Sequence, residues 1–300
     1  MSARRVLLYP FLAFGPGPDR LRACSDVADQ AMIGAGWPGW QPGTAKEGQS
    51  MATQVERATQ LLREAVQSGA YGADEKLAEM HLAEDLGMSR TVIRAALSAL
   101  ELEGLVTRTP NRGFRTRRFT LDEVADSIIL RGEVEAIAAR YACERGLSEE
   151  DLQRFETVLD EMAAILDCGF FEVEHRLKWM ELVAKFHDLL VECSGSSAIR
   201  YSIDHLKRIP LVAPYSVMFD LSSEDYSLGR IRTTFEMRQQ IVEALRLRQA
   251  GRASALMIAY AYQACNNKRE SVEAMRSGRE MSPTPGLGLI AQGKDGQDPR

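Results

Sequence analysis

The segment from Lys76 to Gly113 has the pattern of two helices joined by a tight turn and followed by a β-hairpin. Gly87 stands at the turn, where the first helix, predicted over residues 76–86, must end in a left-handed conformation that glycine adopts without steric cost. Ser89 follows in position to cap the second helix, because its side-chain oxygen can accept a hydrogen bond from an unpaired backbone N–H. Beyond Gly104, short runs on either side of a ProAsnArgGly turn predict two strands. The segment therefore predicts a winged helix-turn-helix.

The second helix of this segment has one apolar face and one polar face. Apolar residues recur at helical spacing, at Ile93, Ala96, Leu97 and Leu100. Polar residues follow one another at steps of four on the other face, with Thr91 beside the first of them: Arg90, Arg94 and Ser98. Guanidinium groups pair with guanine edges and phosphates, and the start of such a helix usually enters the major groove. The polar face therefore predicts DNA binding.

Positive charge is concentrated in the hairpin. Five arginines and no acid lie between Leu105 and Thr120, whereas the whole chain has a formal net charge of -5. A negative net charge disfavours indiscriminate binding to nucleic acid, whereas a basic hairpin favours DNA contacts that are confined to that part of the chain. The alternative is that these arginines form only a solvated face.

Three stretches of this segment, LAEDLGMSRTVIRAAL, LELEGLV and PNRG, resemble the DNA-binding domain of GntR-type bacterial transcription regulators. The resemblance runs from Val55 to about Phe119 and includes a preceding helix over residues 53–68. It implies that DNA is contacted from the second helix by Ser89, Arg90, Thr91 and Arg94, and from the wing by Arg112 and Gly113.

One departure from the family pattern precedes the first helix. The family usually has a Pro-Gly turn and an acid–arginine pair there, where this chain has residues 72–75 and, further on, Met80 and His81. We expect one auxiliary DNA contact to be missing.

Length and composition fit a two-domain globular protein. The chain has 300 residues, of which 45% are hydrophobic and 26% charged. Its apolar runs fall short of the roughly 18 residues that a membrane span needs, so we expect no membrane partner. Five cysteines occur without a C-x-x-C pair, which favours neither a disulfide framework nor a thiolate zinc site. The reduced cytoplasm is the simplest location.

The first fifty residues do not continue this pattern. An apolar run near the start imitates a signal peptide and the residues before Cys24 imitate a lipoprotein box, but Pro10 interrupts the run and Arg22 is wrong for the box. We expect residues 1–50 to be a disordered or non-native extension, with Met51 as the biological start. The alternative is a flexible arm of unassigned role.

From Thr120 onward the sequence predicts helices only. ThrLeuAspGlu is a capping box for a helix over Leu121–Arg145. Further helices are expected over residues 148–167, 171–192, up to 207, 223–249 and 252–275. The predicted fold is mostly α, with a winged helix-turn-helix of three helices and a hairpin over residues 51–119, an all-helical bundle over 120–276, and a disordered tail over 277–300.

The helical half resembles the FCD effector domain found in the FadR branch of the GntR family. The matching pieces are LRGEVEAIAA from Leu130, the PheHis pair that contains His187, IVEAL from Ile241 and RASALM from Arg252. The resemblance implies a ligand-binding and dimerisation domain for small carboxylic or sugar acids, often beside a metal held by one aspartate and three histidines.

This chain departs from that metal-binding pattern. Val183 stands at the position of the aspartate, His187 is kept, and Arg238 and Tyr260 stand at the positions of the other two histidines. One imidazole cannot hold a divalent ion, so we predict no metal and no other cofactor.

An anion site can take the place of the metal site. Arg238 offers a bidentate guanidinium to a carboxylate, and Tyr260 and His187 can donate hydrogen bonds. Family members often place a ligand-facing arginine at the position of Arg131. The alternatives stay open: Arg131 and Glu135 as an ordinary helix pair, His187 as a core histidine, Arg238 on a solvated face. The remaining histidines have no partner at ligand spacing: His81, His175 and His205.

Two functions remain. The first is a homodimeric, sequence-specific regulator of the repressor type that binds double-stranded operator DNA and is controlled by a small carboxylate effector. The second is a helical ligand-binding protein or enzyme with a vestigial DNA-binding domain. Neither a Gly-rich phosphate loop nor a G-x-S-x-G elbow occurs, so we predict no enzyme activity.

Overall fold

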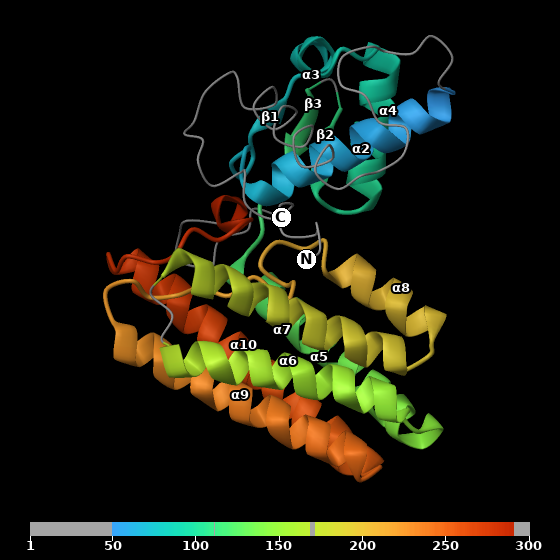
Figure 1. The fold of residues 1–300 in the computed structure, drawn as a ribbon. Helices are drawn as coiled ribbons and strands as arrows, with labels where there is room; N and C mark the ends of the chain where they lie inside the picture. The colour runs from blue at the N-terminus through green and yellow to red at the C-terminus, as the bar shows by residue number, and fades with distance from the viewer. Residues whose placement is uncertain (1–49, 111, 169–171, 291–300) are drawn as a thin grey trace. The chain divides into compact units, whose positions relative to one another are not determined.

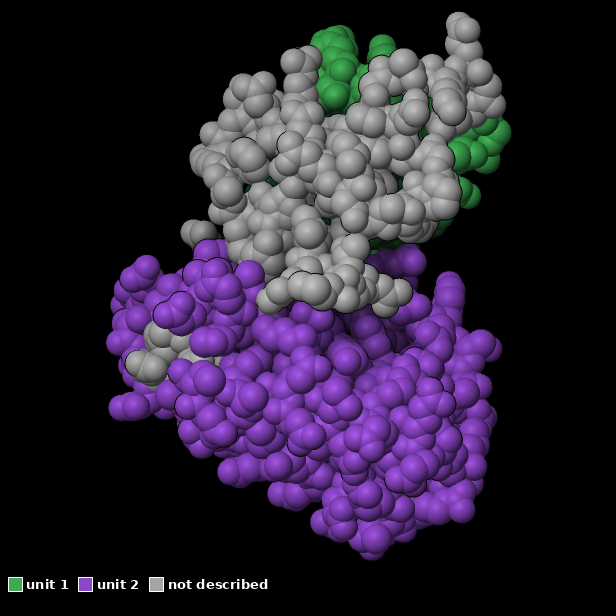
Figure 2. Space-filling view, in the orientation of Figure 1, with its two compact units in different colours: residues 1–119, 285–300 green, residues 120–284 purple. Residues whose placement is uncertain are grey.

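The structure is a computed structural model that describes residues 50–110, 112–168 and 172–290. Two compact units divide the chain (Figure 2). The first comprises Met1–Phe119 with Pro285–Arg300, and the second comprises Thr120–Thr284. The expectation for the N-terminal extension lies outside the described residues, apart from Ser50.

The described part of the first unit contains three α-helices: α2 over Met51–Ser68, α3 over Glu79–Leu86 and α4 over Arg90–Leu102 (Figure 1). Ser50 caps α2 by accepting a hydrogen bond from the backbone N–H of Thr53. The apolar faces of α2 and α4 pack together, and their largest side chains are fully buried: Leu62, Val66, Ile93, Leu97 and Leu100. The predicted winged helix-turn-helix is confirmed.

A small antiparallel sheet forms the wing, with strands in the order β1-β3-β2. The predicted hairpin comprises β2 over Val106–Thr109 and β3 over Gly113–Thr116. The prediction that the first helix begins at Lys76 is wrong, because Lys76–Leu77 forms β1 and pairs with β3. Extended backbone turns the Leu77 side chain into the core, where it is 2% exposed. Helix α3 therefore starts only at Glu79.

The chain returns to the first unit at its C-terminal end. A short 3-10 helix, η3, spans Leu287–Leu289. The backbone N–H of Phe119 donates to the carbonyl of Leu289 at 2.9 Å, and that of Ala73 donates to Gly288 at 3.1 Å. Since residues 277–290 are ordered in this way, the predicted disordered tail is wrong for them. Residues 291–300 lie outside the described part of the chain.

In the described residues, the second unit is a bundle of six α-helices (Figure 1). They are α5 over Leu121–Arg145, α6 over Glu149–Cys168, α7 over Val173–Cys193, α8 over Ser197–Leu206, α9 over Glu224–Arg246 and α10 over Ala250–Arg276. Thr120 and Glu123 form the predicted capping box at the start of α5. No helix in the described ranges is long and apolar enough to cross a membrane.

Helices α5 and α10 approach each other closely at Gly132. A Cβ atom built on Gly132 would lie 2.0 Å from the Cβ of Ala261, so only glycine fits there. The neighbouring residues on the two helices, Arg131 and Tyr260, are both buried. The close contact thus places polar side chains of both helices in the interior of the bundle.

The connection between α8 and α9 is tied to the chain that follows α10. Phe219 and Ser282 exchange hydrogen bonds, from the Phe219 N–H to Ser282 Oγ at 3.0 Å and from the Ser282 N–H to the Phe219 carbonyl at 2.7 Å. Asp220 pairs with Arg279 at 3.0 Å. These contacts fix one wall of the bundle interior.

We expect Leu289→Ala to destabilise the first unit by about 2–5 kcal/mol, because it removes a fully buried side chain and leaves a cavity. Urea unfolding followed by circular dichroism measures this loss. Leu287→Ala, at a half-buried position of the same turn, should cost less. Equal free energies of unfolding for Leu289→Ala and the unchanged chain would show that the C-terminal segment adds nothing to the unit.

Candidate functional site

The start of α4 presents polar side chains to solvent. Gly87 ends α3 with a φ of 62°, and Ser89 Oγ accepts a hydrogen bond from the backbone N–H of Val92 at 3.3 Å. Arg90 and Thr91 follow in the first turn and are exposed. Among the described residues Arg90 has no ion-pair partner. Its guanidinium is therefore available to an external anion.

Arg94 is held by a residue that the sequence did not single out. Glu79 of α3 accepts hydrogen bonds from Arg94 Nε at 3.1 Å and from a terminal nitrogen at 2.7 Å. The hydrogen bond and charge of Glu79 raise the pKa of Arg94. The pair neutralises the charge of Arg94 but fixes the plane of its guanidinium, which leaves the outer N–H groups free to donate. Arg94 is thus a pre-oriented donor.

The wing carries arginines in two kinds of environment. Arg108 lies over the ring of Phe114 at 5.6 Å, and Arg115 donates to the carbonyl of Asp74 at 2.6 Å. Arg112 is exposed at the turn, and Gly113 next to it has a φ of 81°. The structure therefore places all six predicted DNA-contacting residues at the exposed start of α4 or at the wing turn of the same unit.

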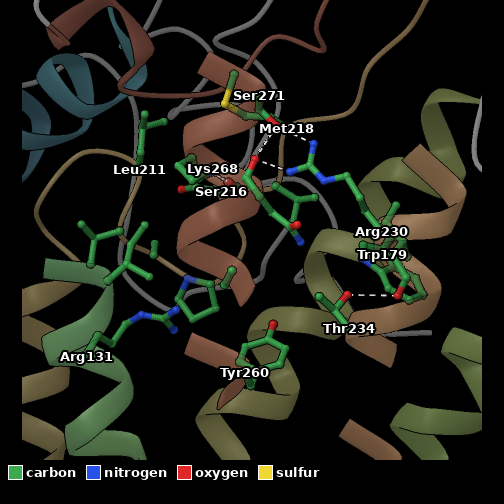
Figure 3. A pocket seen from close by; sticks show the side chains of 18 of the residues that line it. Arg131, Trp179, Leu211, Ser216, Met218, Arg230, Thr234, Tyr260, Lys268 and Ser271 are labelled. Atoms are coloured by element: carbon green, nitrogen blue, oxygen red, sulfur yellow. Dashed lines mark hydrogen bonds between the residues drawn. The ribbon is translucent and has the colours of Figure 1, made fainter. Parts of the chain in front are cut away.

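A cavity lies inside the second unit, between α5, α7, α9, α10 and the connection after α8 (Figure 3). Four positively charged side chains line it, and no carboxylate does: Arg131, Arg230, Arg238 and Lys268. Its volume is about 80 Å³. Because one water molecule needs roughly 10–15 Å³ on this measure, the cavity suits a ligand of several non-hydrogen atoms.

Three of the predicted ligand-binding residues meet in one chain of hydrogen bonds. A terminal nitrogen of Arg238 donates to the hydroxyl of Tyr260, which lies 3.4 Å from His187 Nε2. His187 Nδ1 lies 2.9 Å from a Glu135 oxygen, and Arg131 donates to the same oxygen at 3.0 Å. The fourth predicted residue, Arg131, thus joins through Glu135.

The ionisation states of His187 and Glu135 fix the direction of the hydrogen bonds that these two residues make. Burial lowers the pKa of His187 to about 4, against the opposing charge of Glu135. Burial is the largest influence on Glu135 and disfavours its charged form, but the charge of Arg131 and the interactions with His187 together outweigh burial and lower the pKa to about 2. His187 is therefore neutral, donates from Nδ1 to the carboxylate and accepts from Tyr260 at Nε2.

Several buried cations of the cavity have no carboxylate partner among the described residues. Arg238 is 2% exposed and Lys268 is 8% exposed. Arg238 donates to the carbonyl of Thr234, Lys268 to that of Ser216, and Arg230 to that of Asn267. Neutral carbonyls do not balance these charges. The Nε of Arg238 and that of Arg131 are buried without any hydrogen bond.

Two family models match consecutive parts of this chain. The first, "Bacterial regulatory proteins, gntR family", matches residues 54–115, and the second, "FCD domain", matches residues 126–262. Together they cover the helix-turn-helix with its wing and most of the helical bundle. The chain belongs to the GntR family.

Curated GntR regulators are similar to parts of the chain. The uncharacterized regulator YdhC of Bacillus subtilis is 28% identical over 145 residues, which are 48% of this chain and 62% of that protein. The Nta operon transcriptional regulator of Aminobacter aminovorans is 40% identical over 76 residues, 25% of this chain and 36% of that protein. The matches to these two relatives thus span less than two thirds of their lengths.

Solved structures of the family share the fold. Escherichia coli McbR/YncC aligns with a TM-score of 0.52 at 19% identity, covering 74% of this chain and 99% of that one. A GntR regulator from Rhodococcus sp. RHA1 aligns with a TM-score of 0.52 at 20% identity, covering 73% and 99%. At such identities the likeness concerns the fold alone.

The residues of the bundle do not fit the metal that many FCD domains hold. Val183 is a buried apolar side chain, and the guanidinium of Arg238 has no lone pair for a metal. Nε2 of His187, the single imidazole here, faces a hydroxyl. No group of three His, Cys, Asp or Glu side chains in the described part could hold an ion. The prediction of no metal rests on this donor set.

The other histidines and the cysteines form no site in the described residues. His81 and His205 are exposed, and His175 lies near the start of α7. Four cysteines are free thiols: Cys143, Cys168, Cys193 and Cys265. Cys24 lies outside the described residues.

Two cations of the cavity, Arg230 and Lys268, were not predicted from the sequence to belong to the ligand site. Arg230 and Lys268 lie two steps of four from Arg238 and Tyr260 on their own helices. That spacing was the available signal, because residues four apart lie on the same side of a helix.

We expect Tyr260→Phe to lower the free energy of unfolding by about 1–3 kcal/mol, because it leaves His187 Nε2 and a nitrogen of Arg238 without a buried partner. Urea unfolding measures the change. Tyr262→Phe on the same helix is the control, since Tyr262 is half exposed. Equal effects of the two substitutions would argue against the hydrogen-bond chain.

We expect the stability of the unliganded protein to depend on pH through Lys268. Burial, reinforced by the charge of Arg230, lowers its pKa from 10.5 to about 7. Between those values the unfolded chain holds a proton that the folded chain lacks, so the free energy of unfolding rises with pH. Lys268→Met removes this titration. Unfolding curves at several pH values between about 7 and about 10 test this, and parallel pH profiles of the two proteins would contradict it.

Proposed function

We propose that this GntR-family chain is a sequence-specific DNA-binding transcription regulator, controlled by a small organic anion bound in its helical unit. The observation that carries the proposal is the free guanidinium of Arg90 at the capped start of α4. A charged donor at that position of a helix-turn-helix suits a base edge or a phosphate in the major groove.

DNA reading divides between α4 and the wing. Arg90 and Thr91 supply exposed donors, and Arg94 supplies a donor whose orientation Glu79 has already fixed. Arg112 at the wing turn is suited to a phosphate or to the minor groove beside it. Two copies of the chain would present two such heads to the halves of a pseudo-palindromic operator. We propose a homodimer acting in the cytoplasm, where that operator lies.

The unmatched positive charge of the cavity supports control by an anion without a metal. A carboxylate bound there would accept from Arg238 and from the unpaired Nε groups, and would reduce the cost of the buried cations. Control of DNA binding requires that this anion bind two conformations with different affinity. We propose that the conformation without the anion binds the operator, which makes the protein a repressor.

We expect Arg90→Ala to weaken binding to the DNA upstream of its own gene by about ten- to a hundredfold, as losing a base-contacting arginine costs about 1–3 kcal/mol. A gel mobility-shift titration at fixed salt measures this. Arg90→Ala/Arg94→Ala should bind more weakly still.

Arg140→Ala is the matched control, because Arg140 is an exposed arginine of the helical unit. It should leave the affinity unchanged. Indifference to the double substitution in α4, together with tight metabolite binding or turnover, would favour the alternative of a ligand-binding protein or enzyme with a vestigial DNA-binding domain.

A further inference from the structure

The cations of the bundle cavity form two separate sets along α9 and α10. In the first set, Arg238 of α9 donates to Tyr260 of α10. In the second, Arg230 of α9 donates to Ser271 at 3.1 Å and to the carbonyl of Asn267 on α10. Rising numbers on α9 thus pair with falling numbers on α10, so the two helices run antiparallel.

The two sets are held apart along the helix axes. Arg238 lies eight positions after Arg230 on α9, and Lys268 lies eight positions after Tyr260 on α10. At about 1.5 Å of rise per residue, this is about 12 Å between the Cα positions. Figure 3 shows Lys268, Ser271 and Arg230 on one side of the cavity and Arg131 and Tyr260 on the other.

The wall between the two sets is largely apolar. Thr234 and Ala264 line the cavity at the intermediate level, together with Ile231. The hydroxyl of Thr234 donates to the carbonyl of Ile231 on its own helix at 3.0 Å. The middle of the cavity therefore suits a hydrocarbon segment.

Each set contains a cation that forms no ion pair with a carboxylate of the described residues, although the more distant charges of Glu270 and Asp220 favour the charged form of Arg230. Glu135 already accepts from Arg131 and His187, and its charge belongs to the first set. Arg238 in that set, and Arg230 and Lys268 in the second, form no ion pair with the described residues. A ligand with a single charge would leave one of the two sets unbalanced.

We propose that the ligand of this cavity is a dianion with an anionic group at each end, a short aliphatic dicarboxylate. One carboxylate would lie against Arg238, Arg131 and Tyr260, and the other against Arg230 and Lys268. This inference rests on the proposed function, since it specifies the anion that controls the protein.

Size and protonation support this assignment. The cavity of about 80 Å³ has room for roughly five to eight water-sized groups, which matches a diacid of about four carbons. Burial and the nearby Arg230 hold the pKa of Lys268 at about 7, so a bound carboxylate restores the charge of the ammonium.

Calorimetric titration of the full chain with straight-chain diacids of four to six carbons, the matching monoacids and inorganic phosphate tests the proposal. We expect one diacid to bind at least about tenfold more tightly than its monoacid, for one further charged contact of about 1.4 kcal/mol. Arg230→Gln should lower the diacid affinity to that of the monoacid.

Arg232→Gln is the control, because Arg232 is an exposed arginine on the same helix. Lys268→Met makes the same test independently should Arg230→Gln fail to fold. Equal affinities for diacid and monoacid, or binding of phosphate alone, would overturn the two-ended ligand while leaving anion control intact. Binding of no anion at all, with no effect of any on operator affinity, would overturn both.

Discussion

The cost of burying positive charge governs the helical unit. Arg238 and Lys268 are buried inside the bundle, and ammonium or guanidinium groups without counter-ions are strongly unfavourable there. Burial lowers the pKa of both groups as a result. A fold that keeps such residues in its interior has a lower free energy of unfolding without a bound anion. Binding of an anion would offset that cost.

The hydrogen-bond chain from Arg238 to Glu135 consists of protein groups alone, and three of its members stand where the family pattern places metal ligands. Every donor in it points the same way, from guanidinium to hydroxyl, from hydroxyl to imidazole and from imidazole to carboxylate. Arg131 closes the far end. The fixed guanidinium supplies the positive charge that an ion would supply, and it does so without depending on metal availability.

Local signals were readable in the sequence, and contacts between helices were not. Gly87 and Ser89 act within a few residues, so the start of α4 could be predicted. Glu79 meets Arg94 only because α3 packs beside α4. Lys268 stands among charged neighbours that suggest a solvated face, and only the packing of α10 against α5 and α9 turns it inward. His187, Arg238 and Tyr260 were predictable together through the family pattern, whereas Lys76 belonged to a strand whose partner lies far along the chain.

Phe119 and Ile290 form an isolated β-bridge, and each lies close in sequence to a point where the chain passes from one unit to the other. The chain leaves the first unit after Phe119 and returns to it at Pro285, so two covalent connections join the helical unit to the first unit. The returning connection follows the segment around Ser282, which is hydrogen-bonded to Phe219, the residue after the cavity-lining Met218. Pro285 lies only three positions after Ser282, so the hydrogen bonds at Phe219 lie close along the chain to the point where it re-enters the first unit.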